Sequence, residues 1–176
     1  MYAAAAGQLG RLLAREAITV VYGGAAVGSM RALADGALAA GGRVVGVLPR
    51  FLIDTEPPHP GLTELVLVED LHERKRRMID GVDAVVALPG GSGTFEELLE
   101  VITWKRLGLF LNPIVIVNQN GFYDPLLAQF QRAVEGRFMD QRHLAMWTVV
   151  SGVDEVVAAI KDSPDWSADA RQFAAI

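Results

Sequence analysis

The sequence contains no cysteine and only three histidines and three lysines among its 176 residues. Without cysteine, the chain can form neither a disulfide framework nor a catalytic thiol. The histidines, His59, His72 and His143, do not have the spacing that metal ligands usually show. We therefore predict no metal site and no resident cofactor.

Long apolar runs and an excess of positive charge are also missing. No run reaches the roughly 18 to 20 apolar residues that cross a bilayer, and residues 1–6 lack the basic start of a signal peptide. The formal net charge of -5 argues against a nucleic acid or an anionic membrane as partner. We therefore expect a cytoplasmic protein that binds a small molecule, since a local positive site can still hold an anion.

Short apolar runs alternate with longer segments of helical pattern. Strands are expected over residues 18–22, 43–48, 65–68, 84–88, 114–117 and 148–150, and helices over 27–40, 71–79, 94–107, 123–134 and 153–160. Strands this apolar are buried on both faces, as in parallel sheets. The pattern predicts an α/β fold with a doubly wound, mainly parallel sheet and helices on both faces. Residues 1–162 are expected to form one domain, with 163–176 as an arm or tail.

A glycine-rich loop follows the strand expected over residues 84–88. Glycines let the backbone approach a ligand closely, and their amides can converge on an anion. The helix that follows adds the partial positive charge of its N-terminus. We predict a phosphate site built from Gly90, Gly91, Ser92, Gly93 and Thr94.

Other interpretations of this loop remain open. Glycine-rich turns between strand and helix also occur without ligands, and no Lys-Ser/Thr pair follows the last glycine as in a Walker A motif. Thr94 and Glu97 also fit a capping box, in which Glu97 would only satisfy the start of the helix. A Gly-x-Ser-x-Gly elbow is missing, which argues against a serine hydrolase.

A basic cluster precedes the same strand, at residues 72–77 (HERKRR). It is either a solvated face of a helix or a source of ligands for a phosphate or carboxylate. Under the second interpretation Arg74 and Lys75 would bind the anion, and the planar fork of arginine suits that role.

Residues 73–75 (ERK) and 89–97 (PGGSGTFEE) together resemble the HERK and PGGxGTxxE signatures of the LOG (Lonely Guy) family. Members of this family are cytokinin riboside 5′-monophosphate phosphoribohydrolases, long labelled "lysine decarboxylase-like". Further segments similar to the family lie at residues 21–24, 28–30, 40–42, 46–49, 62–65, 100–104 and 121–123.

The resemblance implies a Rossmann-like homodimer or higher homo-oligomer with a shared active site. Its reaction would hydrolyse the N-glycosidic bond of an N6-modified AMP to the free base and ribose 5-phosphate. The glycine loop would hold the 5′-phosphate, and Arg74 and Glu97 would form the catalytic pair. The other substrate-binding residues implied are Gly23, Gly24, Met30, Lys75, Glu96 and Thr103.

The family normally begins with a strand and a Gly-Ser-Ser loop, whereas this sequence starts inside the following helix, so we expect an edge of the pocket to be missing or to belong to residues outside it. A non-catalytic nucleotide or molybdenum-cofactor carrier on the same fold is the main alternative. A decarboxylase with a pyridoxal-phosphate lysine is a weaker one, and the sequence does not identify the preferred base.

Overall fold

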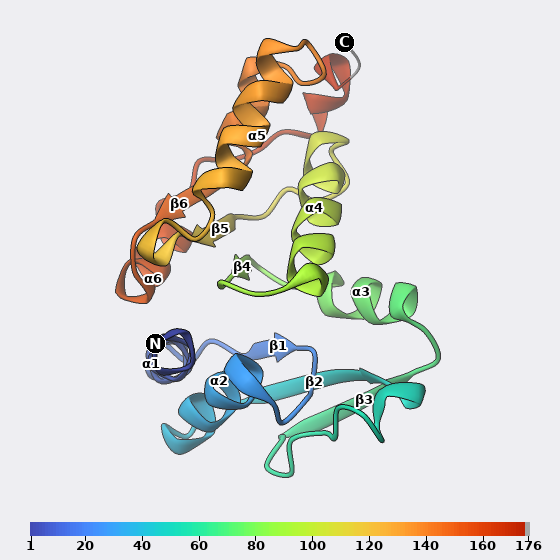
Figure 1. The fold of residues 1–176 in the computed structure, drawn as a ribbon, viewed down its shortest axis with the longest axis vertical. Helices are drawn as coiled ribbons and strands as arrows, with labels where there is room; N and C mark the ends of the chain where they lie inside the picture. Colours follow the sequence, from blue (N-terminus) through green and yellow to red (C-terminus); the bar gives the residue numbers. More distant parts are fainter. Residues whose placement is uncertain (175–176) are drawn as a thin grey trace. The chain divides into compact units, whose positions relative to one another are not determined.

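The computed structural model describes residues 1–174 and divides into two compact units, Met1–Val82 and Asp83–Ile176. Each unit contains its own three-stranded sheet, and every strand pairing in the two sheets is parallel (Figure 1). The predicted α/β class is therefore confirmed, with parallel sheets flanked by helices. The single domain expected over residues 1–162 stays a prediction.

The first unit contains a sheet in the order β1-β2-β3 and three α-helices. Its elements are α1 (Tyr2–Arg15), β1 (Val20–Tyr22), α2 (Gly28–Ala39), β2 (Val44–Pro49), the short 3-10 helix η1 (Arg50–Leu52), β3 (Glu64–Val68) and α3 (Leu71–Ile79). Strand β2 is central, and its residues Val44, Val47 and Leu48 are almost completely buried. Apolar residues of this kind, excluded from water on both faces, form the core of the unit.

Helices α1 and α2 pack closely because glycines lie where they cross. A side chain at Gly36 on α2 would collide with the backbone of Gly7 on α1, and one at Gly10 would collide with the Leu33 carbonyl. Ala6 and Leu9 are buried on the same side of α1. The small residues thus allow the two backbones to approach one another and cover one side of the unit.

The second unit contains a sheet in the order β4-β5-β6. Its elements are β4 (Val85–Ala87), α4 (Ser92–Arg106), β5 (Ile114–Val117), α5 (Asp124–Glu135), β6 (Thr148–Val150) and α6 (Val156–Lys161), with the 3-10 helices η2 (Gln119–Gly121), η3 (Gln141–Met146), η4 (Val153–Glu155) and η5 (Ala168–Phe173). All four residues of the central strand β5 are buried. The helix expected from residue 153 is wrong in its first turn, because residues 153–155 form η4 before α6 begins.

The segment after α6 packs against the C-terminal end of α4. The Trp166 indole donates a hydrogen bond to the Lys105 carbonyl at 2.9 Å, and Arg171 Nε donates to the Leu107 carbonyl at 3.0 Å. Carbonyls in the last turn of a helix have no partner within the helix. The Lys105 carbonyl also accepts from the Gly108 amide at 3.1 Å, so the arm adds a second donor there and supplies one to the Leu107 carbonyl.

Across residues 1–174, none of the helices is both long enough and apolar enough to pass through a bilayer.

Candidate functional site

In the first unit, the candidate residues gather at the turn that follows β1. Gly24 has a φ of 80°, a left-handed conformation that favours glycine, and lies against the backbone of Gly46 in the neighbouring strand. Any side chain at Gly23 would meet the Arg74 guanidinium, and the Met30 sulfur lies on the same side. The structure thus brings together four of the predicted residues: Gly23, Gly24, Met30 and Arg74.

Arg74 reaches this turn from α3. Its Nη2 atom donates to the Gly23 carbonyl at 3.2 Å, whereas its Nε is buried and has no hydrogen-bond partner within the described residues. A buried donor without a partner is costly, since its desolvation is not compensated. The Arg74 side chain is therefore held at the turn by one nitrogen and retains hydrogen-bonding capacity for a ligand.

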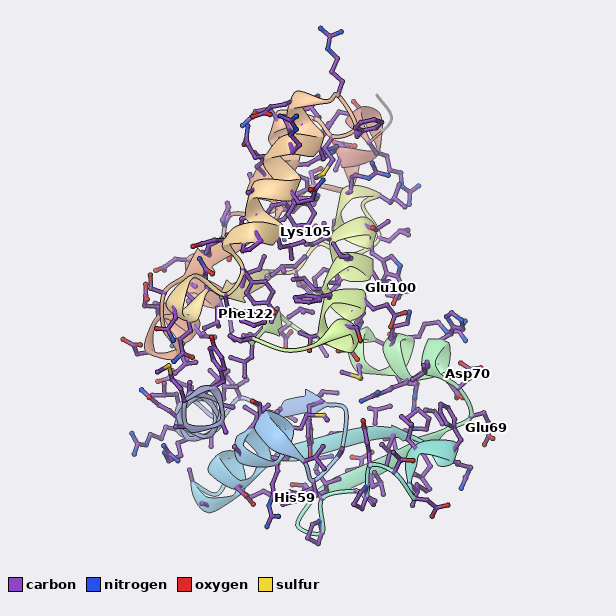
Figure 2. All side chains as sticks on the ribbon, viewed as in Figure 1. His59, Glu69, Asp70, Glu100, Lys105 and Phe122 are labelled. Atoms are coloured by element: carbon purple, nitrogen blue, oxygen red, sulfur yellow. The ribbon has the colours of Figure 1, made fainter. Side chains whose placement is uncertain are left out.

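The start of α3 is fixed by the side chains of Asp70, which Figure 2 labels together with Glu69, and of Glu73. The Asp70 carboxylate accepts from the Glu73 amide at 2.7 Å, and Glu73 accepts in turn from the Glu69 amide at 2.9 Å. The hydrogen bond from the Glu73 amide lowers the pKa of Asp70. Glu73 therefore supports the helix that carries Arg74, while Lys75, the other predicted ligand on α3, is almost completely buried.

In the second unit, the glycine loop connects β4 to α4. The helix begins at Ser92 with Gly91 as its N-cap, and no side chain caps it. The first amides of a helix have no carbonyl partner within the helix. Those of Ser92, Gly93 and Thr94 thus form an uncapped N-terminus, which is suited to an anion.

This helix start tests the capping interpretation of Glu97. A capping box would require Thr94 to be the N-cap, but Thr94 lies inside the helix and its side chain packs against Gly90. The capping-box interpretation is therefore wrong. The expected helix start at residue 94 is also wrong by two residues, because α4 begins at Ser92, directly after its N-cap Gly91.

Glu97 lies four residues after Gly93, on the same face of α4 and one turn from the uncapped amides. Glu96 is exposed on the neighbouring face. Thr103 is six residues beyond Glu97, about 9 Å along the axis at about 1.5 Å per residue, and its hydroxyl donates to the Leu99 carbonyl at 2.8 Å. The structure thus brings Glu97 next to the glycine loop but does not bring Thr103 there.

An aromatic cluster of Phe95, Phe122 and Tyr123 supports the glycine loop where the loop leaves β4. The Phe95 ring lies 6.2 Å from that of Phe122 and 6.1 Å from that of Tyr123. The fully buried Tyr123 donates its hydroxyl to the Leu88 carbonyl at 2.7 Å, at the point where β4 passes into the loop. Burial raises the pKa of Tyr123 to about 12, so its phenol stays protonated and remains a donor.

The support given by Tyr123 was missed at the level of sequence, although the similarity of residues 121–123 to the family was a signal for it. Among residues 1–174, no group of three or more histidine, aspartate or glutamate side chains could hold a metal ion.

Comparison with known proteins identifies close relatives. A family model described as "Possible lysine decarboxylase" matches residues 30–160. A Rhodococcoides fascians protein named cytokinin riboside 5′-monophosphate phosphoribohydrolase is 45% identical over 154 residues, which are 87% of this chain and 78% of that protein. A rice protein (Oryza sativa subsp. japonica) named as a probable enzyme of the same activity is 48% identical over 133 residues, 75% of this chain and 60% of its own length. An Arabidopsis thaliana enzyme of that name is 41% identical over 145 residues, 81% of this chain and 64% of its own length. The chain therefore spans less than two thirds of these two plant proteins.

Solved structures show the same fold at lower identity. The molybdenum cofactor binding protein of Rippkaea orientalis and the molybdenum cofactor carrier protein of Chlamydomonas reinhardtii are each 22% identical, with a TM-score of 0.68. Each comparison covers 91% of this chain and 86% of the other. At this identity the likeness concerns the fold alone.

Proposed function

The chain belongs to the LOG family, and from this premise we propose that it hydrolyses the N-glycosidic bond of an N6-modified adenosine 5′-monophosphate. The products would be the free base and ribose 5-phosphate. The observation that carries the proposal is the uncapped N-terminus of α4 with Glu97 one turn further along. A phosphate on the amides would bring the sugar of the nucleotide within reach of the carboxylate.

In the proposed reaction the 5′-phosphate accepts hydrogen bonds from the amides of the glycine loop. This anchor fixes the anomeric carbon relative to Glu97, which lowers the entropic part of the barrier. Cleavage passes through a sugar with oxocarbenium character, which a nearby carboxylate stabilises. Glu97 would also remove a proton from the attacking water as the base departs with the bonding electrons.

Arg74 has a separate role in this proposal. The 5′-phosphate of the bound nucleotide and the Glu97 carboxylate are both negatively charged and would repel each other. A guanidinium that faces the same nucleotide would offset that repulsion. The buried Nε of Arg74, which has no protein partner within the described residues, supports this role because a ligand oxygen would satisfy it. Arg74 would thus anchor the nucleotide or assist the departing base.

We further propose that the site is completed in a homodimer or higher homo-oligomer, as in the family, and that the protein acts on soluble nucleotide in the cytoplasm.

Variants of the two central residues test this function. We expect Glu97→Gln and Arg74→Ala each to abolish release of base from isopentenyladenosine 5′-monophosphate, as measured by chromatography. Ser92→Ala should have a milder effect, because the loop acts mainly through backbone amides. Arg77→Ala, on the same helix as Arg74 and exposed, is the matched control and should leave activity unchanged. Full activity in Glu97→Gln would contradict the proposed chemistry.

A carrier function is the second candidate, since the solved structures of similar fold bind a molybdenum cofactor. Tight binding of AMP without any turnover would favour it.

Decarboxylation, named in the family description, usually needs a lysine that binds pyridoxal phosphate. Lys75 and Lys105 are both buried, and an absorbance scan after addition of pyridoxal phosphate would detect an aldimine.

A further inference from the structure

The proline-rich segment before β3 pairs with the turn that follows β1. The Ala26 amide donates to the Pro57 carbonyl at 2.9 Å, the His59 amide donates to the Gly24 carbonyl at 2.9 Å, and Ala25 forms an antiparallel bridge with Pro58. This short ladder holds the backbone of the glycine turn from outside the sheet. The position of the turn thus depends on where the segment around His59 lies.

The His59 ring, labelled in Figure 2, fixes that segment. The ring is 8% exposed. Its Nδ1 accepts a hydrogen bond from the Gly61 amide at 3.1 Å, so Nδ1 carries no proton and the proton of the neutral ring is on Nε2. Nε2 lies 2.9 Å from an Asp35 carboxylate oxygen and donates to it.

Asp35 connects the ring to α2. Its side chain is about half exposed and also lies 3.5 Å from Arg31. The hydrogen bond from His59 is the main cause that lowers the pKa of Asp35. His59 therefore joins three segments: its own loop through Nδ1, α2 through Nε2, and the glycine turn through its backbone amide.

The glycine turn is also where Arg74 is held, since the Gly23 carbonyl accepts from its Nη2. A shift of this carbonyl would move the guanidinium, and a displacement of about 1 Å in a catalytic group can cost about 100-fold in rate. Both ring nitrogens of His59 are engaged within the protein, so the ring has no free atom for acid–base chemistry. We propose that His59 and Asp35 form a positioning pair, which holds the glycine turn and through it Arg74.

This inference rests on the proposed function, in which Arg74 contacts the nucleotide. Asp35 is the residue to change, because its exposed side chain can be truncated with little loss of packing. Asp35→Ala removes the acceptor for His59, whereas Asp35→Asn retains an oxygen that accepts from Nε2. Arg31→Ala is the matched control, because it removes the exposed neighbour of Asp35 and leaves the bond to His59 in place.

The test measures base release from isopentenyladenosine 5′-monophosphate by the full chain and its three variants. We expect Asp35→Ala to lower kcat about 10- to 100-fold, Asp35→Asn to recover most of that loss, and Arg31→Ala to match the parent protein. Asp35→Asn and Arg31→Ala should unfold close to the parent protein, whereas Asp35→Ala should unfold at a somewhat lower temperature, because it leaves the buried Nε2 donor of His59 without its acceptor, while remaining folded at the assay temperature. If Asp35→Ala were as active as Arg31→Ala, the proposed positioning role of His59 and Asp35 would be wrong.

Binding of AMP, measured by calorimetry, shows whether the pair acts through Arg74. Asp35→Ala should weaken AMP binding about 10-fold in the parent protein but less than about twofold in the Arg74→Ala background, since effects on one shared interaction are not additive. Equal weakening in both backgrounds would overturn the inference while leaving the proposed function intact. If the parent protein neither released base nor bound AMP, the proposed function would be wrong, and so would the positioning role that rests on it.

Discussion

The buried lysine of α4 should make the stability of the second unit depend on pH. Lys105, labelled in Figure 2, is 3% exposed; its Nζ donates to the Asn112 carbonyl at 2.7 Å and lies 6.0 Å from the centre of the Trp166 ring. Burial lowers the pKa of Lys105 to about 8. In the unfolded chain a lysine has a pKa of about 10.4.

Between these two values the unfolded chain binds more protons than the native protein. The free energy of unfolding must therefore rise with pH in this range. From about pH 7 to about pH 9 the linkage relation gives a rise of about 1 kcal/mol from this residue. Above about pH 10 a second group acts in the opposite direction. Burial raises the pKa of Tyr123 to about 12, so the native protein keeps a phenol proton that the unfolded chain loses, and the free energy of unfolding falls as pH rises.

The variant Lys105→Met keeps an unbranched side chain only one heavy atom shorter and removes the titrating group. Urea unfolding at pH 7, 8 and 9, followed by tryptophan fluorescence, measures the effect; all three tryptophans lie in the second unit. We expect the free energy of unfolding of the parent protein to rise by about 1 kcal/mol and that of Lys105→Met to stay level. The same pH dependence in both proteins would refute the assignment to Lys105.

Two further predictions concern packing. Tyr123→Phe should lower the free energy of unfolding by about 1 to 2 kcal/mol, because the Leu88 carbonyl loses its donor, and it should raise KM for the nucleotide by loosening the glycine loop; unchanged stability would show that this bond contributes little. Gly36→Ala should destabilise the protein by at least about 2 kcal/mol, since its methyl group would meet the backbone of Gly7 and force α1 away from α2. If the variant unfolded at the same temperature as the parent protein, the backbones of α1 and α2 could not lie this close together.

Much of the fold could be predicted from local sequence because the relevant signals are periodic. Residues 114–117 are four β-branched apolar residues in a row, and the predicted strand coincides with β5. Residues 71–79 lie between an aspartate N-cap and Asp80-Gly81, and the predicted helix coincides with α3. The packing of the segment after residue 163 could not be predicted in this way, because it depends on single side chains that bind carbonyls at the end of α4.

The candidate site was predicted less completely, for two physical reasons. The pattern of Thr94 and Glu97 fits a capping box, and only the observed N-cap at Gly91 excludes that interpretation, while the catalytic role of Glu97 stays a prediction. The support from His59 was not predicted because its partner Asp35 lies 24 residues away in the sequence. Contacts of this range depend on the tertiary fold, which no local pattern encodes.

We propose that the glycine loop holds a nucleotide by its phosphate while Glu97 acts in cleavage of its N-glycosidic bond. Incubation of the protein with isopentenyladenosine 5′-monophosphate, with both products quantified over time, tests it most directly. We expect free isopentenyladenine and ribose 5-phosphate in equal amounts, and neither product from Glu97→Gln. Nucleotide recovered intact from the parent protein, or base released equally by Glu97→Gln, would contradict the account.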